Sequence, residues 1–309
     1  MTLQQQIRSN RWRTLLLFLL FAILIAAILA AVSLVADVSL LIVVGIGLII
    51  YGVIMWFASG SVVASLAGAH PITRADHPEL WQAVDSAAVG AGLPRTPDVY
   101  IIDDPAPNAF AAGRDPKHAY VAATTGLLEI MGPRELRAVM AHEIAHVRNR
   151  DVRLMSLAAV LAGVLLILSD ILLRVLVFGG GRNNNNPFAL VGVLVALVLA
   201  PIGAAMIQMA LSRRREYLAD ASAAEITGDP EGMARALAVL EADTRQVSHV
   251  GRATAHLYIE SPLMKGQGLF GSLGGLFQTH PPLEDRIAAL EQSGGFTLDR
   301  SFLAAVPVQ

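Results

Sequence analysis

Two histidines four residues apart, His142 and His146, give the clearest chemical signal in the 309-residue chain. On an α-helix of 3.6 residues per turn, both imidazoles project from one face and can bind a single metal ion. Glu143 follows one position later, about 100° around the helix, where its carboxylate would meet a metal-bound water and not the metal. The spacing predicts a hydrolytic metal site in which Glu143 is the base, although His-Glu-x-x-His also occurs by chance.

A second acidic pair, Glu216 and Asp220, follows a cluster of arginines at residues 213–215. A catalytic zinc ion needs three protein ligands and one open position. The chain has no cysteine, so the ligands must be histidines and carboxylates. By itself the acidic pair would be interpreted as a solvated face; together with His142 and His146, we interpret Glu216 as the third ligand of one zinc ion per chain. Asp220, one turn later, is placed to accept a hydrogen bond from the outer ring nitrogen of a ligand histidine.

The composition indicates what kind of protein must position this site. Of all residues, 54% are hydrophobic and 16% are charged, against about 25% charged in an average soluble domain. These values exclude a disordered chain and a wholly water-soluble globule. The formal net charge of −2 argues against a nucleic-acid partner bound by phosphate neutralisation. Without cysteine, disulfides, cysteine nucleophiles and iron–sulfur clusters are excluded as well.

Four apolar blocks account for the hydrophobic excess: residues 14–36, 38–58, 155–178 and 188–211. Each is close to the ~20 apolar residues that a helix needs to cross the hydrocarbon core, so we predict four transmembrane helices. The arginines that flank the blocks are Arg8, Arg11, Arg13, Arg148, Arg150, Arg153, Arg213, Arg214 and Arg215. The positive-inside rule then puts both termini, and the segment between the second and third helices, in the cytoplasm. We therefore expect a multi-pass protein of the cell (inner) membrane, in contact with the lipid bilayer.

The predicted domain organisation alternates membrane and soluble segments. Residues 1–58 hold the N-terminal tail and the first two membrane helices, 59–154 the first part of a catalytic domain, 155–211 the other two membrane helices, and 212–309 the second part of the domain. Both soluble parts emerge on the same side, so we expect them to fold together. Helices are predicted at 78–90, from 133 onward, and at 213–227, 231–242 and 282–292, with strands at 98–102 and 118–123. The fold class is a mainly α integral membrane protein with a small sheet in its cytoplasmic α+β domain.

Several of these motifs, in this order, resemble those of the HtpX-like membrane zinc metalloproteases. The segments that carry the likeness are His142-Glu-Ile-Ala-His146-Val-Arg-Asn149-Arg-Asp151, Arg215-Glu216-Tyr-Leu-Ala-Asp220, Thr279-His280-Pro-Pro with Arg286, Asn108-Ala-Phe110-Ala, and Val121-Ala-Ala-Thr124-Thr-Gly-Leu-Leu. The likeness covers nearly the whole chain; the related prenyl-protein (CAAX) endopeptidases are larger and have more spans. The resemblance implies that His142, His146 and Glu216 bind zinc, that Glu143 is the base, and that the catalytic domain is zincin-like (gluzincin).

The same resemblance implies roles for residues outside the ligand set. His280 is the candidate second donor to the oxyanion, because in relatives the His-Pro segment lies near the cleft; a surface histidine at a helix start is the alternative. We expect Asn149, like Asp220, beside the ligands, and Arg286 in a structural pair with a buried carboxylate. The implied substrates are polypeptides, in particular damaged or misassembled membrane proteins, which would give the protein a role in quality control and the stress response.

We expect the substrate to bind as an extended chain. Residues 118–124 are predicted to form a short strand, and as an edge strand it could pair its backbone, around Val121, with a polypeptide. Asn108 and Phe110 would flank this strand; for Phe110, core packing is the alternative. Residues 266–271 match G-x-G-x-x-G, but no predicted strand precedes them, so we expect no nucleotide.

Two other functions stay open. An intramembrane protease of the site-2 type would hold its His-Glu-x-x-His inside a span, but Arg134, Glu135, Arg137 and Arg148 make this helix too charged for that position. A non-catalytic membrane chaperone or scaffold would use a structural zinc ion. Glu143 discriminates against this function, because a structural site needs no base beside its ligands.

Overall fold

The structure is a computed structural model that describes residues 38–156, 213–243, 245 and 281–307, with a few isolated positions between 12 and 23. The chain divides into two compact units, Met1–Ser59 with Ser156–Ala210 and Gly60–Met155 with Leu211–Gln309. Apart from most of the first helix, every element described below belongs to the second unit. The domain boundaries drawn from the sequence stay a prediction.

The predicted membrane helices fall largely outside the described residues. The block 38–58 lies within α2 (Val38–Leu66). In the described part of the chain, no single helix is long and apolar enough to cross a bilayer, and the pieces Gly45–Ala58 and Gly60–Leu66, bent by 76°, meet this test only as a pair. The arrangement with four membrane helices therefore stays a prediction.

A small mixed sheet belongs to the second unit. Its strands are β1 (His70–Pro71), β2 (Asp98–Ile102), β3 (Ala109–Gly113) and β4 (Ala119–Thr124), in the order β1-β2-β4-β3. β2 and β4 run parallel, and the two outer pairs are antiparallel. The predicted strands near 98–102 and 118–123 are confirmed, as is the combination of a small sheet with many helices.

The prediction that residues 118–124 form an edge strand was wrong. β4 lies between β2 and β3, so Val121 pairs with Val99 on one side and with Ala111 on the other. A hairpin pairs β3 with the edge of β4 that does not contact β2. Gly113, at a φ of 138°, makes the turn possible, since a Cβ there would lie 2.3 Å from the carbonyl oxygen of His118. β3, and not β4, is thus the outer strand.

The two faces of the sheet join different cores. On one face, Ala111, Val121 and Ala123 pack into the larger core together with buried residues of α3 (Pro78–Gly90) and α5 (Pro133–Arg148). On the opposite face, Phe110 and Tyr120 belong to a second core and meet edge to face, with ring centroids 6.0 Å apart. Phe110 therefore packs in a core on the face away from α5, which was the alternative for this residue, and its contact with a substrate stays a prediction.

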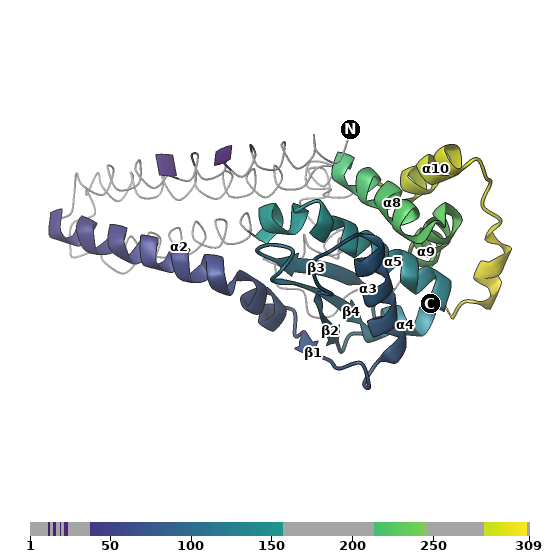
Figure 1. Ribbon diagram of the computed structural model, residues 1–309, viewed down its shortest axis with the longest axis horizontal. Coiled ribbons are helices and arrows are strands. Elements are labelled where there is room, and N and C mark those ends of the chain that lie inside the picture. Colours follow the sequence, from purple (N-terminus) through teal and green to yellow (C-terminus); the bar gives the residue numbers. More distant parts are fainter. Residues whose placement is uncertain are drawn as a thin grey trace, which may run out of the picture. The chain divides into compact units, whose positions relative to one another are not determined.

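The remaining helices gather around α5, as Figure 1 shows. α4 (Thr125–Ile130) precedes it; α8 (Arg213–Thr227) and α9 (Pro230–Ala242) pack against it; α10 (Leu283–Gly294) packs on α8 and α9, and the 3₁₀ helix η3 (Arg300–Ala305) on α9. The helices predicted at 78–90, from 133, and at 213–227, 231–242 and 282–292 are confirmed to within two residues.

The N-terminal turn of α5 is fixed to α9 by two sets of charged contacts. Arg134 forms a bidentate pair with Asp229, with both N–O distances at 2.7 Å. Arg235 donates to Glu135 at 2.7 Å, and its guanidinium carbon lies 3.7 Å from the ring centroid of Phe302 in η3. These contacts tie the helix with the His-Glu-x-x-His motif to the C-terminal part of the chain.

We predict that Arg235→Ala lowers the unfolding free energy by about 1–3 kcal/mol, because it leaves the mostly buried Glu135 without its cation and removes the stacking on Phe302. The matched control is Arg300→Ala, which removes an exposed pair with Glu241 and should cost less than about 1 kcal/mol. Denaturant unfolding of both variants in detergent measures the difference. Equal losses in the two variants would contradict the anchoring role of Arg235.

Candidate metal centre

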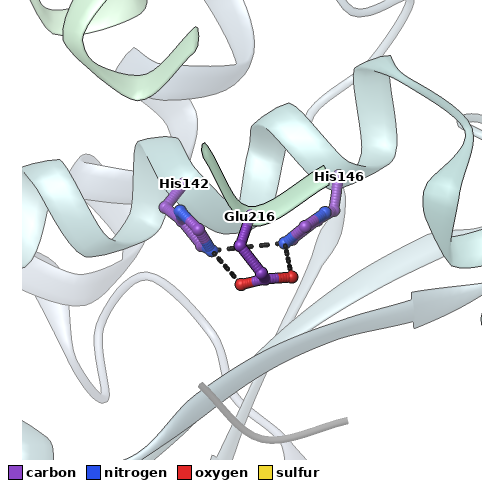
Figure 2. A group of neighbouring side chains, drawn as sticks. All are labelled: His142, His146 and Glu216. Carbon is purple, nitrogen blue, oxygen red and sulfur yellow. Dashed lines mark hydrogen bonds and ion pairs between the residues drawn. The ribbon is translucent and has the colours of Figure 1, made fainter. Parts of the chain in front are cut away.

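Three side chains from two helices converge on one point, as Figure 2 shows. His142 and His146 project from α5, and Glu216 comes from the first turn of α8. The two Nε2 atoms are 3.2 Å apart, and they lie 3.6 and 3.7 Å from the two carboxylate oxygens of Glu216. One ligand atom from each residue falls within 4.8 Å of the others, so the three could hold one metal ion.

α5 carries its two histidines into the interior because it is covered on nearly all sides. Twelve of its 16 residues are buried, among them His142, Glu143 and His146. The sheet, α3, α8 and α9 all pack against it and provide this cover. The packing of α8 brings Glu216 to the histidine pair.

Each histidine is oriented by a carboxylate on its outer ring nitrogen. Asp220 Oδ1 lies 2.9 Å from Nδ1 of His142, and Asp151 Oδ2 lies 3.1 Å from Nδ1 of His146. Because an ionised carboxylate only accepts hydrogen bonds, each Nδ1 carries a proton, and each Nε2 can offer its lone pair on the side of Glu216. Two imidazoles and one carboxylate, oriented in this way, fit the donor set of a catalytic zinc ion.

A buried arginine, Arg286 of α10, holds Asp220 in place. Its Nε and Nη2 donate to the two oxygens of Asp220 at 2.8 and 2.6 Å, and its Nη1 lies 3.6 Å from Oε2 of Glu216. Burial disfavours the ionised form of Asp220, but the charge of Arg286 and its hydrogen bonds lower the pKa of this carboxyl group below its ordinary value. The prediction that Arg286 pairs with a buried carboxylate is confirmed.

Glu143 lies beside the ligands, buried on the same helix. Burial raises the pKa of its carboxyl group, and the charge of Glu216 adds to this, against the opposing effects of His142, His146 and the backbone N–H of Ala111. A general base works best when its pKa approaches the working pH. The shift in Glu143 is therefore in the direction that accepting a proton from water requires.

Other residues singled out by the sequence lie elsewhere. Asn149 is buried at the C-cap of α5, where its N–H donates to the carbonyl of Ala145 at 2.9 Å. Asn108 precedes β3 and is buried, with its Oδ1 accepting from the N–H of Ala109 at 2.9 Å. The substrate contact of Asn108 and the placement of Asn149 beside the ligands stay predictions, and His280 lies outside the described residues.

Sequence reasoning missed the role of Asp151. It stands five positions after His146, a spacing that on a continuous helix would separate the two side chains by about 140°. The contact exists because α5 ends at Arg148. The one available signal was that Asp151 closes the motif segment from 142 to 151 on which the family resemblance rests.

A helical His-Glu-x-x-His whose two histidines meet a glutamate from another helix is the arrangement of metal-dependent peptidases. The model of Peptidase family M48 matches residues 74–293. The chain is 46% identical over 245 residues to "Protease HtpX homolog" of Tropheryma whipplei (strain Twist), covering 79% of this chain and 82% of that one. It is 40% identical over 304 residues to "Protease HtpX homolog" of Lactobacillus helveticus (strain DPC 4571), covering 94% and 99%. A solved structure, "Crystal Structure of S. mikatae Ste24p", aligns with a TM-score of 0.48 at 19% identity, over 93% of this chain and 66% of that chain.

The chain therefore belongs to Peptidase family M48, and it is a metallopeptidase. The resemblance to the HtpX-like proteases that the motifs indicated is confirmed by relatives at 40–46% identity.

We predict that metal binding releases a proton from His142. Burial disfavours its imidazolium form, but hydrogen bonds to Asp220 and Glu216 outweigh this effect and raise the pKa of His142 to about 9 in the metal-free protein. Below that pH a proton competes with the metal, so the apparent zinc affinity should rise about tenfold per pH unit through neutrality. Competition titrations against a zinc chelator at several pH values measure this slope.

Asp220→Asn serves as the control for the pH dependence. It removes the carboxylate that raises the pKa of His142, so the rise in zinc affinity should level off at a lower pH than in the wild type. A wild-type affinity that does not change with pH below 9 would contradict the prediction.

We also predict that Arg286→Met destabilises the metal-free protein by about 3–5 kcal/mol, because Asp220 would be left as a buried charge without its cation. The double variant Arg286→Met/Asp220→Leu should recover most of this loss, since neither charge is then left alone. Melting temperatures of the two variants and the wild type provide the comparison. If the single and double variants have the same melting temperature, Arg286 does not act through Asp220.

Proposed function

We propose that the chain is a zinc-dependent endopeptidase, attached to the cell membrane, that cleaves polypeptides at the cytoplasmic face. The observation that carries the proposal is the buried group His142, His146 and Glu216, with Glu143 next to it and a carboxylate on the outer nitrogen of each histidine. A zinc ion held by these three ligands would supply a Lewis acid and lower the pKa of a water to about 7.

Glu143 acts as the general base in this proposal. One step along α5 from a ligand, its carboxylate is turned about 100° away from the ligand direction, so with zinc bound it would meet a water and not the metal. It accepts the proton of the attacking water, and as the acid it then donates that proton to the nitrogen of the departing amine. The raised pKa of Glu143 favours both steps, since the group must hold the proton between them.

The substrate would bind along the outer edge of β3. The N–H of Thr124 donates to the carbonyl of Asn108 at 2.9 Å, so the alternation of an antiparallel ladder directs the backbone groups of Ala109 and Ala111 away from β4. The N–H of Ala111 is also a hydrogen-bond donor to Glu143. An extended polypeptide added to this edge would pass beside the base, and pairing through the backbone makes recognition tolerant of sequence.

Attachment to the membrane is supported by the four apolar blocks and by the arginines that flank them. It is also supported by a group of large apolar side chains exposed on α2: Ile42, Ile46, Ile49, Ile50, Val53, Ile54 and Phe57. Quality control of damaged membrane proteins, the finer part of the proposal, rests on the resemblance to HtpX-like proteases. The site would then act on segments that membrane proteins expose in the cytoplasm.

Features of α5 argue against the two alternatives. For an intramembrane protease, its charged first turn would have to lie in lipid, whereas Arg134 and Glu135 pair with Asp229, the N-cap of α9, and with Arg235 of α9. A scaffold with a structural zinc ion would have no use for a buried carboxylate such as Glu143, which costs free energy and coordinates nothing.

We predict that Glu143→Gln lowers cleavage of casein or of a membrane-protein substrate by about 10²–10⁴-fold, because general base catalysis contributes roughly that factor. Zinc stoichiometry should stay at one per chain. Glu216→Gln should instead lose zinc and activity together. The control is Glu129→Gln, because Glu129 is exposed and pairs with Arg245 at the surface; this variant should keep both zinc and activity. Cleavage assays and metal analysis of the purified wild type and of these three variants, all in detergent, test the prediction.

Two outcomes would refute the proposal. One is equal cleavage by the wild type and by Glu143→Gln, which would mean that Glu143 is no base. The other is a wild type that binds one zinc through His142, His146 and Glu216 yet cleaves no polypeptide, which would favour the scaffold.

A further inference from the structure

Arg150 has an unusual backbone conformation for its residue type. With a φ of 61°, it is the one residue other than glycine with a positive φ in the described part of the chain. The left-handed conformation is less favourable for an L-residue than the right-handed one, because the Cβ crowds the following carbonyl oxygen. Such a cost is maintained where the surrounding structure needs the conformation, and Arg150 lies within four residues of His146.

The conformation of Arg150 ends α5. The helix stops at Arg148, and Asn149 caps it with a right-handed φ of −78°. The N–H of Arg150 then donates to the carbonyl of Val147 at 3.1 Å. This is the position after the cap, where glycine is the usual residue because it adopts a positive φ freely. Helical structure resumes at Asp151 and continues through Ser156, so Arg150 separates two helices.

The interruption brings Asp151 to His146. The two residues would point about 140° apart on an unbroken helix, yet Oδ2 of Asp151 lies 3.1 Å from Nδ1 of His146. Asp151 is fully buried, and its other oxygen lies 4.0 Å from Nη1 of Arg215 in α8. The left-handed residue directly before Asp151 is therefore what turns this carboxylate back onto the histidine.

We propose that Arg150 is a positioning residue for the metal site. Its left-handed backbone, and not its side chain, places Asp151 on Nδ1 of His146, which sets the tautomer and the ring orientation of that ligand. The inference rests on the proposed function in one respect: it takes His146 to be a zinc ligand.

The experiment compares substitutions that differ in their tolerance of a positive φ, in the full chain in detergent. Arg150→Gly removes the side chain and permits the conformation, so its zinc dissociation constant should stay within about threefold of the wild type, with an equal or higher melting temperature. Arg150→Val, β-branched and strained there, should raise the dissociation constant about 10–100-fold, the range expected on losing a partner of a ligand histidine. Arg148→Val, at a helical backbone position, is the control and should leave it within about threefold.

Two further variants test whether the effect passes through Asp151. Asp151→Ala should reproduce the loss in Arg150→Val, and the double variant should be no worse than Asp151→Ala, because both substitutions remove the same contact. Histidine-selective ¹⁵N NMR of the metal-free protein gives a readout independent of zinc and of activity. Wild type and Arg150→Gly should keep the Nδ1–H tautomer of His146, whereas Arg150→Val and Asp151→Ala should show a mixture.

The proposal is overturned if Arg150→Gly weakens zinc binding as much as Arg150→Val, since the side chain would then be responsible, or if Arg150→Val binds zinc like the wild type. Should Arg150→Val not fold, Arg150→Ala takes its place: it must melt below Arg150→Gly, and the same melting temperature in both variants would also overturn the proposal. Failure of the proposed function can be told apart from failure of this proposal, because the tautomer of His146 is observed without metal or substrate.

Discussion

Several carboxylates are buried around one point, and the structure depends on giving each of them a partner. Glu143, Asp151, Glu216 and Asp220 are nearly inaccessible to water, and an isolated buried carboxylate would either cost several kcal/mol or take up a proton. Asp220 is neutralised by the bidentate contact with Arg286, and the ring N–H groups of the two histidines bond to Asp151 and Asp220. A divalent cation held between the histidines and Glu216 would complete the balance of charge.

This requirement explains why the site needs elements that are far apart in the chain. Arg286 of α10 reaches Asp220 of α8 across 66 residues, and Arg235 of α9 reaches Glu135 of α5 across 100. α5 is then enclosed by the sheet, α3, α8 and α9, which all contribute buried residues to the larger core. Small residues on the sheet, such as Ala111 and Ala123, let the helix lie close to β3. Glu143, the proposed base, and the outer strand are therefore neighbours through this packing and through the hydrogen bond from the N–H of Ala111.

Local patterns in the sequence were sufficient wherever the chemistry or the structure is local. The pairs His142 with His146 and Glu216 with Asp220 share helical faces, so their spacing predicted which side chains could act together, and Arg286 was correctly expected to pair with a buried carboxylate. The strand pattern at 118–124 was also correct, but the order of strands was not, because order depends on which hairpin folds onto β4. For Phe110 the sequence left core packing and substrate contact open, because the face of the sheet that it occupies follows from the register of β3.

What the sequence by itself determined is the metallopeptidase chemistry, the helices and strands that carry it, and the membership in Peptidase family M48, because each follows from residue types at short, fixed spacings. What only the tertiary structure decided is which groups complete the site. Asp151 reaches His146 through a helix break at Arg150, and β3 becomes the outer strand through a glycine turn at Gly113. Both depend on backbone conformations with positive φ, which helical and strand periodicity do not encode, and on contacts between segments that become neighbours only when the core is packed.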